Sequence, residues 1–173
     1  MRNLEYLDHA CYLPVLTSSM SRKIAPGGYI EFQDYGCEIF TRDGTLLEGL
    51  IPEHPVTRYM HSTSTAAERA GRPLRMGRGM AERMKKAGFV DVQERAEVWP
   101  LGSWPKQRDM KELGKWGGLA MKEGAYPFAL MLLSREGWTK EQVKEMTDAT
   151  VTSILKSTYY AHVWFVYGRK PEA

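Results

Sequence analysis

A proline–glycine turn that leads into an aromatic strand constrains the fold of this chain more than any other feature. Pro26 lacks an N–H group and cannot continue a helix, and Gly27 and Gly28 allow the positive φ angles of a tight reversal. The segment that follows, Tyr29-Ile30-Glu31-Phe32, favours a β-strand. The turn therefore predicts that a helix ends near residue 24 and that a strand begins near residue 28.

The composition indicates a single globular domain. The chain has 173 residues, 43% hydrophobic and 26% charged, with a formal net charge of +3. This length fits one domain, residues 1–173. The net charge is too small to favour nucleic-acid binding, and the most basic segment, 69–86, reads as a solvated helix face.

Cysteine usage and hydropathy point to an intracellular protein. Cys11 and Cys37 are the only cysteines, and neither lies in a CxxC motif, so no disulfide framework is expected. The chain opens with no charged-then-apolar leader, and no apolar run reaches the roughly 18 residues that a membrane span needs. We therefore expect a cytoplasmic or nuclear location, without a membrane partner.

Hydrophobic periodicity and turn signals predict strands separated by helices. The predicted strands are 28–40, 89–98 and 159–167. The predicted helices are 3–24, a helix containing 66–70, 77–87, the helical section 106–136, and 139–155, with a loop over 45–57. The pattern predicts an α/β fold with a sheet of about three strands and flanking helices.

One proline and one capping pattern predict where helical turns begin. Pro127 precedes a nearly continuous apolar run and is expected in the first turn of a helix. Thr139 and Gln142 have the spacing of a capping box, and Trp138 and Val143 that of the matching hydrophobic staple.

Four short blocks carry a resemblance to a known family. They are Ala25-Pro26-Gly27-Gly28-Tyr29-Ile30-Glu31-Phe32, Ala87-Gly88-Phe89-Val90-Asp91-Val92, Trp99-Pro100-Leu101-Gly102-Ser103-Trp104-Pro105 and Val166-Tyr167-Gly168-Arg169-Lys170-Pro171. In this order and spacing they resemble the C-terminal half of class I S-adenosylmethionine-dependent methyltransferases. The most similar subgroup is the fungal LaeA-like enzymes of secondary metabolism.

The resemblance implies a truncated Rossmann-like sheet. The strand after the turn would be the fifth of the family's seven strands, and the strand at Phe89 the sixth. The strand at Tyr159 would be the seventh, inserted antiparallel between the other two. The helical section 106–136 would be the substrate-side insertion of the subgroup.

The family's cofactor site has no counterpart in these residues. In the family, a glycine-rich loop after the first strand and an acidic residue at the end of the second hold S-adenosylmethionine. The only GxG here, Gly77-Arg78-Gly79, opens a predicted helix without a preceding strand. We therefore expect no cofactor-binding residues in the isolated chain, and we expect Gly117-Gly118, inside an apolar helical stripe, to be a close-packing point.

Six residues are candidates for binding a small-molecule substrate, and the catalytic residues stay unassigned. By resemblance, the end of the fifth strand faces the substrate, which selects Gln33, Asp34 and Tyr35. The other candidates are His61, in a polar run, and Trp104 and Trp116, which suit an apolar pocket. Each also has an ordinary structural explanation, namely a strand exit, a helix cap or core packing. The four histidines and two cysteines show no metal-ligand spacing.

Three functional hypotheses remain open at this point. The first is a methyltransferase-family protein of fungal secondary metabolism, whose own enzymatic activity is undecided because the cofactor-binding half is missing. The second is a repurposed fold that binds a small molecule for non-methylating chemistry such as cyclisation. The third is a non-enzymatic interaction module, in which a homodimer or a partner chain covers an exposed sheet edge.

Overall fold

The computed structural model describes residues 23–47 and 53–172, and the predicted helix at 3–24 lies almost entirely outside them. The described strands are β1 (Tyr29–Phe40), β2 (Val90–Pro100) and β3 (Tyr160–Arg169). The helices are α2 (Pro55–Arg69), α3 (Met80–Lys86), α4 (Arg108–Leu133), the 3-10 turn η3 (Ser134–Glu136) and α5 (Lys140–Lys156).

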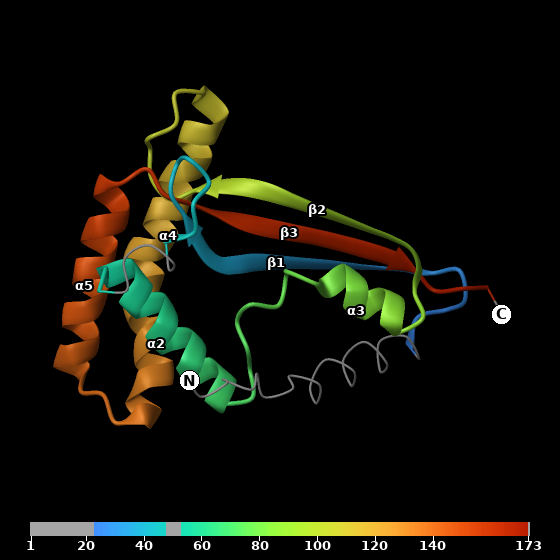
Figure 1. Cartoon of the computed structure of the whole chain (residues 1–173), viewed down its shortest axis with the longest axis horizontal. Helices are drawn as coiled ribbons and strands as arrows, with labels where there is room; N and C mark the ends of the chain where they lie inside the picture. Colours follow the sequence, from blue (N-terminus) through green and yellow to red (C-terminus); the bar gives the residue numbers. More distant parts are fainter. Residues whose placement is uncertain (1–22, 48–52, 173) are drawn as a thin grey trace, which may run out of the picture.

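The three strands form one sheet with the last strand in the middle. The order is β1-β3-β2, and β3 is antiparallel to both neighbours (Figure 1). Phe32 of β1 faces Val166, and Arg95 of β2 faces Phe165. The α/β prediction and the central, antiparallel position of the final strand are therefore confirmed.

The turn before β1 closes against the end of the chain. Gly27 has a φ of 75°, a conformation that glycine adopts at little cost. Its N–H donates to the carbonyl of Lys170 at 3.0 Å, and the Lys170 N–H donates back to Gly28 at 2.8 Å. The turn thus extends the pairing of β1 with β3 beyond the ends of both strands.

Helices cover opposite ends of the sheet. The short helix α3 lies under the end of the sheet near the chain's C-terminus, while α2, α4 and α5 gather at the other end (Figure 1). Under α3, Met80 and Met84 pack with Phe89 and Val166. The larger core joins residues of α2, α4, α5 and the strand ends, among them Val56, Ala129, Val143, Ile154 and Leu101.

Two prolines lie in helices where the sequence predicted otherwise. The loop expected over 45–57 is wrong at its end, because α2 begins at Pro55 with His54 as its N-cap. Proline is tolerated there because the N–H groups of a first helical turn have no intrahelical partner. Pro127 lies inside α4 and not in a first turn. Burial of Ala125, Ala129 and Leu133 on the same helix offsets the cost of about 3 kcal/mol for an internal proline.

The start of α5 follows the predicted capping pattern. The Thr139 hydroxyl accepts the Gln142 N–H at 3.3 Å, and the Gln142 side chain accepts the Thr139 N–H at 2.9 Å. Trp138 and Val143 belong to the same apolar cluster. The capping box is confirmed. Of the helices in the described part of the chain, none is both long and apolar enough to cross a bilayer.

Glycines allow α4 to cross the end of β2 at backbone contact. The Gly102 N–H donates to the Gly114 carbonyl of α4 at 3.0 Å. A Cβ on Gly114 would overlap the Gly102 carbonyl, and a Cβ on Gly117 would overlap the Pro100 carbonyl and approach Trp99 Nε1 to 2.9 Å. The close-packing point expected at 117–118 therefore lies against the β2 end.

Gly117→Ala should lower the free energy of unfolding by about 2 kcal/mol, because the new methyl group forces α4 away from β2. Gly124→Ala is the matched control on the same helix, since its Cβ would meet nothing within 4 Å. Gly124→Ala should raise the free energy of unfolding by up to about 1 kcal/mol, because alanine has a higher helix propensity than glycine. Urea denaturation measures both, and equal effects of the two substitutions would contradict the close crossing.

Candidate functional site

An apolar cavity of about 570 Å³ lies against β1, which is an edge strand of the sheet that the described residues form. This volume is within the range of small-molecule sites. We call it the β1 cavity. Its lining residues come from β1, α2, α4 and the segment before α3: Phe32, Asp34, Tyr35, Cys37, Ile39, Tyr59, Met60, Thr63, Pro73, Leu74, Met76, Ala120, Met121, Gly124, Ala125 and Phe128.

The edge position of β1 explains how both faces of the strand reach one cavity. Asp34 and Tyr35 are consecutive in β1 and point to opposite faces, yet both line the cavity. The cavity therefore reaches around the open edge of the strand. Just beyond Tyr35, the pairing shifts, because the four steps from Tyr35 to Ile39 face only two on β3, from Val163 to Ala161. Such bulges are frequent beside functional sites, where they redirect side chains.

Asp34 places a carboxyl group in these apolar surroundings. Desolvation by partial burial raises the pKa of Asp34, while the N–H groups of Tyr35 and Gly77 oppose this rise more weakly. A buried carboxyl group is costly unless it is paired, so its presence at the cavity wall indicates a group able to accept a hydrogen bond from a bound molecule.

Tyr35 carries a buried hydroxyl group that has no hydrogen-bond partner among the residues that the structure describes. Its ring contacts Trp99 edge-on, with centroids 6.4 Å apart. Burial, and then the proximity of Cys37 and Tyr59, raises the pKa of Tyr35, so the hydroxyl stays protonated and able to donate. Buried polar groups are nearly always satisfied, which makes this hydroxyl the clearest indication that the cavity accommodates a polar atom of a ligand.

The other polar groups of the cavity are committed within the protein. The Tyr59 hydroxyl donates to the Ala125 carbonyl at 3.2 Å, and the Thr63 hydroxyl donates to the Tyr59 carbonyl at 2.8 Å. Burial raises the pKa of the Cys37 thiol to about 11, so it stays protonated. Sequence reasoning missed Tyr59 and Thr63 as lining residues; their i, i+4 spacing was a usable signal once α2 is known to start at Pro55.

The remaining predicted site residues lie elsewhere. Gln33 is exposed and donates from its side chain to Glu31 at 2.8 Å. His61 borders a separate hollow of about 180 Å³ between α2 and the end of α4. Trp104 lines another cavity, and Trp116 is 60% exposed and lines none of these three. The structure thus brings together only Asp34 and Tyr35 of the six.

His54 resembles a catalytic base in its contacts but acts as a helix cap. Its Nε2 lies 3.1 Å from the Ser153 hydroxyl and 3.3 Å from the Tyr159 hydroxyl. Its Nδ1 accepts the Val56 N–H at 3.2 Å, so the neutral ring carries its proton on Nε2. Nε2 is then a donor and cannot take a proton from Ser153, which excludes a serine–histidine pair in this state.

The only GxG segment does not form a cofactor loop. Gly77 is buried against Trp164, and a Cβ there would lie 2.7 Å from Trp164 Cγ. Gly79, with a φ of 79°, is the N-cap of α3, and no strand precedes it directly. This segment therefore does not supply a glycine-rich cofactor loop. The described residues contain no group of three His, Cys, Asp or Glu side chains placed to hold a metal.

Comparison with known proteins identifies homologous fungal sequences. No protein-family profile matches the chain. The methyltransferase pytC of Aspergillus terreus is 29% identical over 154 residues, which cover 88% of this chain and 46% of pytC. The probable methyltransferase tdiE of Emericella nidulans is 26% identical over 163 residues, covering 92% of this chain and 50% of tdiE. The protein-methionine methyltransferase laeA of Chaetomium globosum is 26% identical over 140 residues, which cover 80% of this chain and 43% of laeA.

Among solved structures, an N-methyltransferase of Haemonchus contortus bound to S-adenosylhomocysteine aligns with 92% of this chain and 30% of its own, at 16% identity. Its TM-score of 0.42 is too low to establish a shared fold. The fungal sequences confirm the resemblance carried by the four blocks. The chain spans about half the length of the curated relatives it matches, and it is a homologue of the fungal methyltransferases that include pytC, tdiE and laeA.

Proposed function

We propose that this chain forms the substrate-binding side of a methyltransferase of fungal secondary metabolism. The β1 cavity would receive an apolar small molecule that carries one hydroxyl or N–H group. The observation that carries this proposal is that an otherwise apolar cavity is lined by Asp34 and by Tyr35, whose buried hydroxyl has no hydrogen-bond partner among the described residues. The fungal methyltransferase homologues support it.

Apolar and polar residues of the cavity would contact different parts of the bound molecule. Met60, Met121 and Phe128 bury the apolar body of the molecule. Asp34 accepts a hydrogen bond from its hydroxyl or N–H group, and Tyr35 donates one to an acceptor on the same molecule. The two polar side chains orient the molecule, because an incorrect pose leaves them desolvated and unpaired.

In the homologous family, S-adenosylmethionine supplies the methyl group. The close packing of Gly77 against Trp164 supports our view that the only GxG segment does not bind this cofactor. We therefore propose that methyl transfer depends on cofactor-binding residues outside the described ones. Without them, the same cavity would serve binding or non-methylating chemistry such as cyclisation.

The open edge of β1 supports a second candidate function, a homodimer formed by strand pairing. Within residues 23–47 and 53–172, β3 is the only strand that pairs with β1, and Phe40 at the end of β1 also forms an isolated bridge with Leu46. Tyr29 on this edge strand is 63% exposed. The opposite edge strand, β2, carries charged Glu94, Arg95 and Glu97, which discourage pairing. β1 also carries the acidic residues Glu31, Asp34 and Glu38, so the exposed Tyr29 is the feature that makes β1 the edge to test.

Asp34→Asn should weaken the binding of 1-naphthol about tenfold, because it replaces a charged acceptor by a neutral amide oxygen, a difference of about 1.4 kcal/mol. Isothermal titration calorimetry at neutral pH measures this change. Naphthol binding should also weaken as the pH falls through the raised pKa of Asp34, because the protonated carboxyl is the weaker acceptor.

The methyl ether of 1-naphthol is the matched control ligand. It lacks the donor and should bind the parent chain and the Asp34→Asn variant alike, whereas an equal loss for both ligands would indicate a damaged cavity. Titration with S-adenosylmethionine should give no binding heat. Micromolar binding of that compound would overturn the view that its site lies outside these residues.

Tyr35→Phe should raise the free energy of unfolding by about 1 kcal/mol while weakening naphthol binding, because it removes a desolvated hydroxyl that only a ligand satisfies. Tyr59→Phe is the matched control. It deletes the hydrogen bond to Ala125 and should lower stability by about 1 kcal/mol. If urea denaturation finds both variants destabilised, the Tyr35 hydroxyl has a partner within the protein and the proposal loses its main support.

For the strand-pairing candidate, sedimentation equilibrium at micromolar concentration should show a dimer that Tyr29→Lys dissociates, since an edge lysine opposes pairing. A monomer at all accessible concentrations would exclude this candidate and leave the cavity proposal unaffected.

A further inference from the structure

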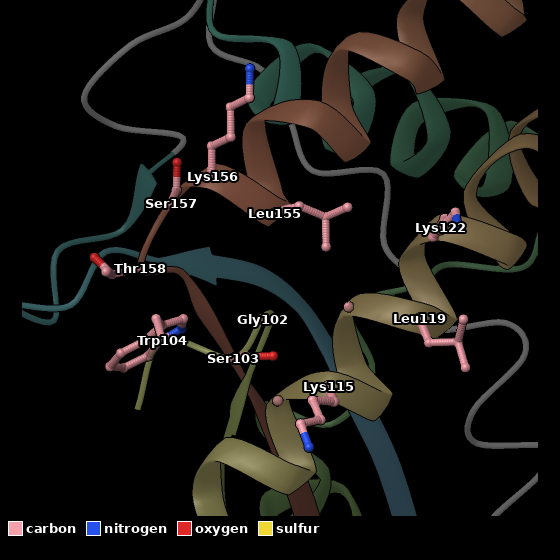
Figure 2. Close-up of a pocket in the computed structure, with 12 residues that line it drawn as sticks. Gly102, Ser103, Trp104, Lys115, Leu119, Lys122, Leu155, Lys156, Ser157 and Thr158 are labelled. Carbon is pink, nitrogen blue, oxygen red and sulfur yellow. The ribbon is translucent and has the colours of Figure 1, made fainter. Parts of the chain in front are cut away.

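A second cavity, of about 520 Å³, opens between the 102–104 connection, α4 and the C-terminal end of α5. Figure 2 shows the indole of Trp104 on one side of this hollow and Leu119 on the other, with Leu155 between them. Three lysines, Lys115, Lys122 and Lys156, belong to its lining, and no carboxylate does among the described residues that form it. This cavity is separate from the β1 cavity and shares no lining residue with it.

The apolar wall of this cavity is fixed by hydrogen bonds. Trp104 Nε1 donates to the Tyr159 carbonyl at 2.9 Å, which holds the indole plane in place. The Gly102 N–H donates to the Gly114 carbonyl at 3.0 Å, which ties the same connection to α4. The wall therefore exists before a ligand arrives, and binding does not have to order it.

The positive charge of the cavity is only partly neutralised. Lys115 pairs with Glu112 at 2.6 Å. Lys122 and Lys156 form no ion pair within the described part of the chain. Ser157 and Thr158, which follow α5 directly, add hydroxyl donors beside Lys156. Ammonium and hydroxyl donors next to an apolar wall form an environment suited to an anion with a hydrophobic body.

The charge is also local, which separates this site from a nucleic-acid surface. On the exposed side of α5, Lys144 pairs with Asp148 at 2.6 Å, and the whole chain carries a formal net charge of only +3. Binding of a polyanion requires a continuous basic surface. The distribution favours one anionic group of a small molecule.

We propose that this cavity binds a small organic anion. A planar apolar body lies against Trp104, and a phosphate or carboxylate group lies toward the end of α5, where Lys156, Ser157 and Thr158 supply donors, while Lys122 adds positive charge from α4 on the other side of the hollow. This inference does not depend on the β1 cavity or on methyl transfer.

Phenyl phosphate is the probe for this site, compared with phenol and with inorganic phosphate. Titration followed by 1H–15N NMR of the full chain should shift the Trp104 indole N–H and the Gly102 and Gly118 amides. Phenyl phosphate should bind at least about tenfold more tightly than either fragment, because only it uses the indole and the lysines together.

The double substitution Lys122→Gln and Lys156→Gln should weaken phenyl phosphate binding at least about tenfold at low ionic strength. The matched control is Lys111→Gln with Lys144→Gln, which removes the same charge from the same two helices outside the cavity. This control should change the affinity less than about twofold, since distant exposed charges are screened. All four lysines are exposed, and unchanged thermal unfolding verifies that the variants fold.

Three results would overturn the proposal. The first is an unmoved Trp104 indole resonance at saturating probe. The second is equal weakening by the two double substitutions, which would show that binding reflects diffuse charge. The third is tighter binding of a single-stranded oligonucleotide than of phenyl phosphate with loss in the control variant, which would show a polyanion surface instead.

Discussion

The backbone hydrogen bonding of β3 to both of its neighbours is the constraint on which the rest of this structure depends. β3 is the last strand in sequence and the middle strand in space, so β1 and β2 never pair with each other. Among the described residues, each therefore has one edge without a neighbouring strand. The pairing of β1 shifts at the bulge after Tyr35, and residues on both sides of this bulge line the β1 cavity. The candidate site thus follows directly from the strand order.

Helix α4 packs closely against β2 at one point and borders the β1 cavity at another. Where α4 crosses β2, Gly114 and Gly117 bring two backbones into contact and leave no room for a side chain. Further along α4, Met121 and Phe128 face an open volume. Tyr35 lines the same volume, and its buried hydroxyl has no partner among the described residues, a local cost that a ligand would relieve.

Local signals in the sequence predicted much of the fold. The Pro-Gly-Gly turn, the strands near 28–40, 89–98 and 159–167, and the capping box at Thr139 all rest on residues close in sequence. The central position of β3 came only from the family resemblance, because periodicity carries no information on strand order. Pro55 and Pro127 were misjudged, since a proline's effect depends on helix position and on burial elsewhere on the helix.

The candidate site was less predictable than the fold, because it depends on contacts between residues that are distant in sequence. Asp34 and Tyr35 were predicted as candidates from the family resemblance and their place at the end of a strand core, but the other lining residues of the cavity, from α2 and α4, are distant in sequence. Tryptophan is a residue type that often lines apolar pockets, but Trp116 is mostly exposed. A side chain type indicates what a residue is able to bind, whereas only the packing of α2 and α4 against β1 decides which residues meet.

The most direct test of the central claim is a crystal structure of the chain soaked with 1-naphthol. The account predicts the ring system between α4 and β1, with its oxygen within about 3 Å of the Asp34 carboxyl or the Tyr35 hydroxyl. Density for the compound only beside Trp104 or on the protein surface, with the β1 cavity empty or closed, would contradict it.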